Sequence, residues 1–255
     1  MNTQSRYKVL EMLSITKGAT TNQISQYLYG DDTADHCRSA RRLLNRMLKG
    51  KFVRWIGKAH MAATGRPQMV WDLSSNGAQL IGCSFSNKPK EFEFLQKSLL
   101  RSEYYINNLG EFPAKFENRH KIFEYFGVTW PWINGDKYRN EVGALVCVHE
   151  NHVYLILPII DPLEVSDLFS DLYQFRWVTK PNYNLVLMTL AAQSDVIRDE
   201  FEAIRNGSKF GSAVSQSPEL SPTVFETSVV RVTLNDRVHD PKPSVSSPEL
   251  AVEGP

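Results

Sequence analysis

Residues 34 to 49 combine basic and apolar residues at the spacing of a helix, and the basic types are those that bind nucleic acid. At about 100° per residue around a helical wheel, the apolar residues gather on one side: Cys37, Ala40, Leu43, Leu44, Met47 and Leu48. Polar residues gather on the opposite side, with Arg46 at its margin: Arg38, Arg41, Arg42, Asn45 and Lys49. Guanidinium groups match guanine, and asparagine matches adenine, in the major groove of DNA. The pattern therefore predicts a helix with one side in the core and the other open to DNA.

A solvated surface is the alternative explanation, since most charged helical faces simply contact water. Such faces usually alternate acidic and basic residues that pair one turn apart, whereas no acidic residue follows Asp35 in this stretch. The imbalance favours DNA binding. Arg41, Arg42 and Asn45 are expected to contact base edges. Arg38 and Lys49 are expected to contact phosphates.

Two helices are predicted before this one. Apolar residues at helical spacing indicate a first helix from Tyr7 to Thr16, which Lys17-Gly18 ends. Thr20 and Gln23 have the spacing of a capping box, in which each side chain bonds the other residue's backbone amide. They predict the start of a short second helix that ends at Gly30. The turn that follows it, Asp31-Asp32-Thr33, provides the N-cap of the third helix.

A β-hairpin is predicted after the third helix. Phe52–Ile56 alternates as a strand, and Gln68–Leu73 is its expected partner. The polar connection between them, residues 57–67, carries Lys58 and Arg66. Ser74 or Ser75 then caps a short helix that runs to Ile81. Three helices, a hairpin and a fourth short helix are the order of a winged helix-turn-helix, whose third helix suits the major groove. On this interpretation Lys58 and Arg66 lie on the wing and bind phosphates.

The charge of the chain is divided unevenly. Residues 1–82 contain twelve basic and five acidic residues, a net charge of +7, so the remainder carries −6 within a total of +1. A basic unit joined to an acidic one indicates a polyanionic partner for the first.

Composition places the chain among ordinary globular proteins, with 42% hydrophobic and 11% aromatic residues. No apolar run approaches the ~18 residues of a membrane span, and the first residues lack a signal-peptide pattern. The cysteines are odd in number and widely spaced: Cys37, Cys83 and Cys147. They fit neither a disulfide framework nor a zinc cluster. We therefore expect a cytoplasmic protein without a membrane partner.

Beyond Gly82 the pattern changes to a linker, a helix and then alternating strands and helices. The helix Glu91–Leu109 carries an apolar stripe at a spacing that permits either dimer packing or core packing. The later elements are predicted as strands at 142–148, 153–160, 184–189 and 224–234, and helices at 165–175 and 195–205. From about residue 235, proline, serine and charged residues predict a disordered tail.

These patterns predict an α+β protein. Its expected parts are a winged helix-turn-helix at 1–82, a linker with a connecting or dimerisation helix at 83–110, a mixed α/β domain at 111–234 and a disordered tail at 235–255.

Residues in the second half that could carry chemistry have simpler explanations. The run from His149 to His152 is expected to be a turn between two strands, not a metal pair. Trp130 and Trp132, next to a proline, are expected in a core. The four acids that could hold a metal lack a matching lysine and are expected on a solvated surface: Glu141, Asp161, Glu164 and Asp167. Without a phosphate-binding or nucleophile motif, the sequence predicts no enzyme, cofactor or metal.

The N-terminal motifs resemble the replication-relaxation family of bacterial plasmids and mobile elements. The resemblance is carried by Gly18–Ile24, Ala40–Met47, the Gly65–Gln68 segment and Trp71–Ser74 with Gly77-Ala78. It covers about the first 110 residues. It implies that the second domain has a restriction-endonuclease-like fold, although the acid and the acid-x-Lys pair that such a nuclease needs are missing at Gly143-Ala144 and in the run 155–160. The expected domain is therefore a degenerate one.

The leading hypothesis is a sequence-specific double-stranded DNA-binding protein that regulates transcription or replication of a plasmid, phage or other mobile element. A homodimer on an inverted repeat is expected, and the α/β domain could bind a protein or small-ligand effector. Two alternatives stay open at this point. One is a metal-dependent nuclease with an atypical site, and the other is a protein-interaction adaptor that uses the winged helix.

Overall fold

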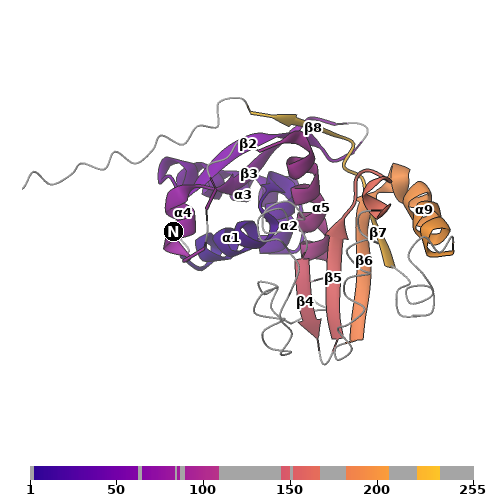
Figure 1. The fold of residues 1–255 in the computed structure, drawn as a ribbon. Coiled ribbons are helices and arrows are strands. Elements are labelled where there is room, and N and C mark those ends of the chain that lie inside the picture. The colour runs from indigo at the N-terminus through magenta and orange to yellow at the C-terminus, as the bar shows by residue number, and fades with distance from the viewer. Residues whose placement is uncertain are drawn as a thin grey trace, which may run out of the picture.

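The computed structural model of the chain has an α+β fold with two four-stranded sheets (Figure 1). It describes residues 3–62, 65–83, 85–86, 90–108, 145–149, 152–166, 182–206 and 223–235. The α+β class predicted from the sequence is confirmed. None of the helices in these described ranges is long and apolar enough to cross a membrane.

The N-terminal elements follow the predicted order of three helices, a hairpin and a short helix. They are α1 (Thr3–Thr16), β1 (Ala19–Thr20), α2 (Thr21–Tyr29), α3 (Ala34–Lys49), β2 (Val53–His60), β3 (Gln68–Leu73) and α4 (Ser75–Leu80). The bounds of α3 and β3 are those predicted. The two-residue strand β1 was not predicted, because it is too short to show a periodic pattern.

Local capping explains where the short helices begin and end. Thr20 and Gln23 form the predicted capping box at the start of α2, and Gly30 ends that helix with a left-handed φ of 84°. The side chain of Ser74 accepts a hydrogen bond from the amide of Gly77 and so caps α4. At α3 the N-cap is Thr33, whose own side chain does not cap the helix.

The first sheet has the strand order β1-β3-β2-β8, and all its neighbours are antiparallel. In the predicted hairpin, Val53 pairs with Leu73 and Ala59 with Gln68, with a bulge between Trp55 and Gly57. The strand β2 is longer than predicted and continues to His60, because it is paired on both sides.

The prediction of one strand at 224–234 was wrong, because the chain forms a separate strand β8 (Arg231–Leu234) there. That segment forms two strands, β7 (Thr223–Thr227) and β8, which belong to different sheets. The chain passes from one sheet to the other through residues 228–230, where the amide of Val230 donates to the carbonyl of His60 at 3.1 Å. The run of β-forming residues is uninterrupted in the sequence, so the pattern could not show that the chain changes from one sheet to the other.

The core of the N-terminal elements contains the apolar sides of α1, α2 and α3 together with β3. Its fully buried members include Leu10, Leu13, Ile24, Leu44 and Trp71. The predicted apolar side of α3 is buried except for Leu48, which is 40% exposed. Leu48 lies in the last turn of α3, one residue before its end, so the prediction for this residue was wrong.

The helix α5 (Phe92–Asn108) stands between the N-terminal elements and the second sheet (Figure 1). Leu95 and Leu99 pack against the first sheet, while Leu100 and Tyr104 pack against the second. Of the two roles left open for its apolar stripe, core packing within the chain is the one observed.

The second sheet has the strand order β4-β5-β6-β7. Its elements are β4 (Leu145–His149), β5 (His152–Pro158), β6 (Asn182–Leu190), a short 3₁₀ turn η1 (Ala191–Gln193), α9 (Ser194–Asn206) and β7. Strands β4 and β5 pair antiparallel up to His149 and His152, so the prediction that these two strands are neighbours is confirmed. The pairs β5–β6 and β6–β7 are parallel, with α9 in the second crossover.

Some predictions fall outside the described residues. They are Trp130 and Trp132, Glu141, Asp167, most of the helix at 165–175 and the tail beyond Asn235.

Candidate nucleic-acid interface

The helix α3 presents all of its predicted DNA-binding side chains to solvent. The exposed residues are Arg38, Arg41, Arg42, Asn45, Arg46 and Lys49. The opposite side is buried by Cys37, Ala40, Leu43, Leu44 and Met47. Because the core anchors one side, the helix cannot rotate to hide the other. The basic side is therefore a fixed feature of the surface.

Two of these arginines have contacts on the helix itself. Nη1 of Arg38 donates to the carboxylate of Asp35 at 2.8 Å, one turn away, and both side chains are mostly exposed. Nε of Arg46 donates to the carbonyl of Arg42 at 3.2 Å. Within the described part of the chain, the side chains of Arg41, Arg42 and Asn45 have no hydrogen bond or ion pair. Their donors and acceptors are therefore available to a ligand.

The turn before α3 is organised by Asp31. Its Oδ1 accepts hydrogen bonds from the amide and hydroxyl of Thr33, at 3.0 and 2.9 Å, and lies 2.6 Å from Nδ1 of His36. The His36 ring stacks on Tyr29, the last residue of α2, with 4.7 Å between centroids. The backbone hydrogen bond from Thr33, followed by the contact with His36, lowers the pKa of Asp31 to about 2. Asp31 thus holds the turn before α3 together, where Thr33 provides no side-chain N-cap.

The wing residues are only partly where the sequence suggested. Arg66 is exposed in the connection between β2 and β3, as expected. Lys58 was expected in that flexible connection, but it lies within β2, between Met69 of β3 and Thr233 of β8. Its exposed ammonium group is 5.7 Å from the centroid of the Trp55 ring. Lys58 lies in the sheet and not in a loop, because the pairing with β8 extends β2.

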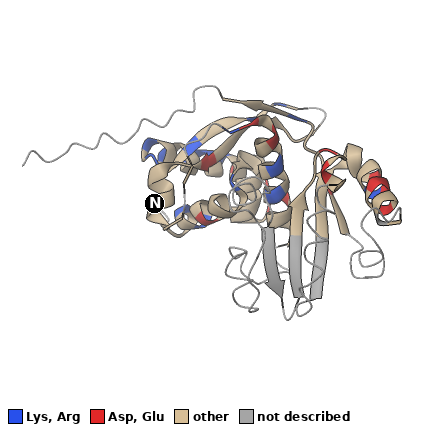
Figure 2. Ribbon diagram, viewed as in Figure 1, with Lys and Arg blue, Asp and Glu red and all other residues tan. Residues whose placement is uncertain are grey.

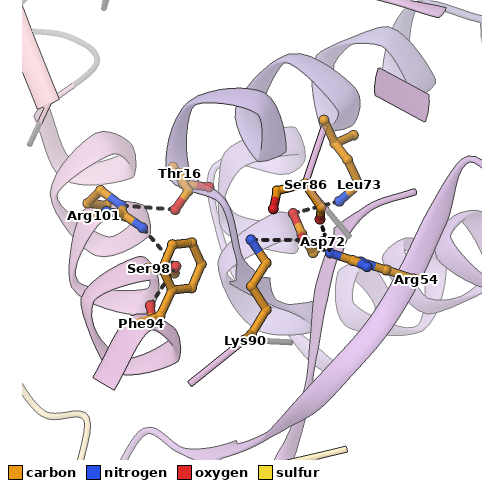
Figure 3. Close-up of polar contacts among 9 residues, drawn as sticks. All are labelled: Thr16, Arg54, Asp72, Leu73, Ser86, Lys90, Phe94, Ser98 and Arg101. Atoms are coloured by element: carbon orange, nitrogen blue, oxygen red, sulfur yellow. Dashed lines mark hydrogen bonds and ion pairs between the residues drawn. The ribbon is translucent and has the colours of Figure 1, made fainter. Parts of the chain in front are cut away.

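A buried charge cluster joins the hairpin to α5 (Figure 3). Nη2 of Arg54 donates to Oδ2 of Asp72 at 3.0 Å, and Nζ of Lys90 lies 3.7 Å from the same oxygen. Arg54 and Asp72 are almost fully buried, at 6% and 4% exposure. Both belong to the charges of the basic unit, residues 1–82. They compensate each other, so the excess of positive charge there comes from other residues.

Arg101 of α5 lies beside this cluster and is buried against α1 (Figure 3). Its Nη2 donates to Oγ of Ser98 at 2.8 Å, and its guanidinium is 5.4 Å from the centroid of the Phe94 ring. Burial lowers the pKa of Arg101 to about 10. These contacts replace water around the buried charge, which gives Arg101 a structural role.

Glu164, one of the acids considered for a metal site, is used in a different way. Its Oε2 accepts a hydrogen bond from Nζ of Lys97 on α5 at 2.6 Å, and its Oε1 accepts from the amides of Ile160 and Asp161. Glu164 is therefore only partly solvated, with 25% of its side chain exposed, because a lysine distant in sequence reaches it. In the described residues, no three histidine, cysteine or acidic side chains are grouped as metal ligands would be.

Charged residues are unevenly distributed over the described elements. Lys and Arg predominate on α3 and the hairpin, α5 carries both signs, and Asp and Glu predominate on α9 (Figure 2). Arg231 of β8 was not among the predicted DNA-binding residues, because only strand pairing brings it to the hairpin.

Comparisons of the chain with protein-family models, with curated proteins and with solved structures found no match.

Proposed function

We propose that residues 3–83 form a winged helix-turn-helix and that the protein binds double-stranded DNA in a sequence-specific way. The observation that carries the proposal is the exposed side of α3: after Asp35, five of its six exposed polar residues are basic, and the reverse side is locked in the core. In a helix-turn-helix the second helix, here α3, lies in the major groove.

The arrangement of strands supports the same proposal. The order of elements is α1, β1, α2, α3, β2, β3, and the hairpin strands pair next to the short strand β1. This places the connection between β2 and β3, with the exposed Arg66, at the end of the hairpin. A wing at this place would bind backbone phosphates beside the helix that reads bases.

The biological role that we propose is regulation of transcription or replication on a plasmid, phage or other mobile element. It is supported by the resemblance of the N-terminal motifs to the replication-relaxation family. A homodimer would place two copies of α3 on the halves of an inverted repeat, one helical turn or a multiple of it apart.

The test is selection of duplexes from a random library by the purified protein, followed by binding measurements with variants. Arg42→Ala is expected to weaken binding of the selected duplex by about 1–3 kcal/mol and to relax specificity at one base position. Arg41→Ala and Asn45→Ala are expected to do the same at neighbouring positions. Arg198→Ala is the matched control, because Arg198 is an exposed arginine on the distant α9.

Normal binding of the selected duplex by all three α3 variants would overturn the assignment. Absence of any duplex binding by the wild-type protein would overturn the proposed function as a whole.

A further inference from the structure

The strand β8 is held against β2 by backbone pairing and by additional hydrogen bonds. The pairs are Gly57 with Leu234, Lys58 with Thr233, Ala59 with Val232 and His60 with Arg231. The amides of Val230 and Asn235 donate to the carbonyls of His60 and Ile56, at 3.1 and 2.9 Å. The hydroxyl of Thr233 donates to the carbonyl of Lys58 at 3.3 Å. The register of β8 on β2 is therefore fixed along its length.

The register decides which side chains share the outer face of the sheet. Ala59 and Val232 are cross-strand partners, and both are buried in the cluster that contains Leu95 and Leu99 of α5. Because side chains alternate between the two faces of a strand, the residues on either side of this buried pair point outward. The outward residues are Lys58 and His60 of β2 and Arg231 and Thr233 of β8. Arg231 is exposed.

Arg231 is thereby close to one other cationic side chain, Lys58, and to His60. Directly opposed residues have Cβ atoms about 4.5–5.5 Å apart, and diagonal neighbours lie about 7–8 Å apart. Arg231 is directly opposite His60 and diagonal to Lys58. The strands β2, β3 and β8 contain one acidic residue, Asp72, which is buried against Arg54. Positive charge on this outer face is not balanced by an acid of its own strands.

The positive charges of Lys58 and Arg231 lie on neighbouring strands, and an anion bound over both would offset their mutual repulsion. His60 is the last residue of β2, so Arg231 lies at the end of the sheet from which the connection with Arg66 begins. On the basis of the proposed DNA-binding function, we propose that β8 is a third strand of the wing and that Arg231 binds a backbone phosphate of the duplex beside Lys58. The wing then depends on a residue from the far end of the chain.

A salt titration with a fluorescein-labelled random-sequence duplex tests the proposal. Each lost phosphate contact reduces the slope of log K against log salt by about 0.9. Arg231→Gln should therefore flatten the slope by about one, measured by fluorescence anisotropy between about 50 and 200 mM salt. It should weaken binding equally for unrelated duplex sequences, since a phosphate contact reads no base. Arg231→Lys should retain most of the slope.

Two controls separate a lost contact from other effects. Arg198→Gln removes an equivalent exposed arginine from α9 and should leave the slope unchanged. Slow amide exchange at Val230 and Asn235 in Arg231→Gln would show that β8 is still paired with β2.

The possible results have different consequences. A wild-type slope for Arg231→Gln, together with weakened binding by Arg42→Ala, would overturn the wing role of Arg231 and leave it as a cation that protects an edge strand from aggregation. If the wild-type protein binds no duplex, the proposed function fails and this role fails with it. The proposal is supported if the slope of log K against log salt falls by about one in Arg231→Gln and stays unchanged in Arg198→Gln.

Discussion

The Nε of Arg101 on α5 donates a hydrogen bond of 3.0 Å to the carbonyl oxygen of Thr16, the last residue of α1. Nearby, the hydroxyl of Ser102 donates to the carbonyl of Gly18, and Nε2 of Gln23 donates to the carbonyl of Leu99 at 3.2 Å. These buried bonds attach the segment between α1 and α2 to α5. Since α5 also packs on the second sheet, α5 connects that sheet to the helices that lead to α3.

Replacement of Arg101 by methionine is expected to lower the free energy of unfolding by about 1–3 kcal/mol. The substitution fills a similar volume but leaves the buried carbonyl of Thr16 without its donor, and an unsatisfied buried acceptor costs about that amount. Urea unfolding measures the change. Arg198→Met, at an exposed position of α9, should stay within about 0.5 kcal/mol of the wild type. An equally small effect of Arg101→Met would contradict a structural role for Arg101.

Substitution of Gly57 by alanine is expected to release β8 from the hairpin. A Cβ at Gly57 would lie 2.3 Å from the carbonyl oxygen of Thr233 and 2.9 Å from a methyl group of Leu95. Overpacking of this kind costs about 1–3 kcal/mol, and the exchange of the Val230 and Asn235 amides should become faster, because both are bonded to β2.

Gly30→Ala is the matched control for this prediction. Gly30 has a positive φ of 84° and open space around its Cα, so alanine there costs backbone strain of about 1 kcal/mol without a clash. It should destabilise α2 and leave the exchange of the Val230 and Asn235 amides unchanged relative to global unfolding. Similar exchange profiles for both variants would show that Gly57 has no specific role in seating β8.

The ion pair between Lys97 and Glu164 is expected to contribute a measurable coupling energy between α5 and the second sheet. Lys97 is 11% exposed and Glu164 is 25% exposed, so solvent screens the pair only in part. A double-mutant cycle of Lys97→Met and Glu164→Gln should give about 1–2 kcal/mol. Glutamine keeps the acceptor that caps the amides of Ile160 and Asp161, so the cycle isolates the charge. Additive effects of the two substitutions would show that the pair is not coupled.

The pKa of Asp31 makes the turn before α3 sensitive to acid. Because its pKa is lowered from 3.8 to about 2, the ionised carboxylate stabilises the fold at pH values above about 4. This stabilisation is lost as the pH falls through 2. The difference in urea midpoint between the wild type and Asp31→Asn should therefore be largest near neutral pH and should shrink below pH 4.

Carbon-detected NMR titration of the Asp31 carboxyl group provides the direct measurement. An ordinary aspartate pKa would mean that the contacts with Thr33 and His36 do not form in solution. Asp199→Asn, at an exposed position of α9, is the comparison for the urea measurements.

The sequence by itself determined the features that depend on residues close together in the chain. The capping box of Thr20 and Gln23 and the sided pattern of α3 follow from local hydrogen bonds and from helical periodicity. The strand β3 could be predicted as the hairpin partner of Phe52–Ile56, because two β-forming runs close together in the chain mark a hairpin. Of the candidate site, exposure of the six α3 residues and of Arg66 was foreseen.

Tertiary structure decided which groups are buried and which distant segments meet. Arg54 and Asp72 look like surface charges in the sequence, but the fold buries the pair, with the Phe85 ring against Arg54 and Lys90 near Asp72. The place of Lys58 within a sheet, and of Arg231 beside it, depends on pairing between β2 and β8. The sequence does not show which strands pair, because backbone hydrogen bonds between strands form with almost any residue type. The helix that faces DNA in our proposal was therefore visible in the sequence, whereas the third strand of its wing was not.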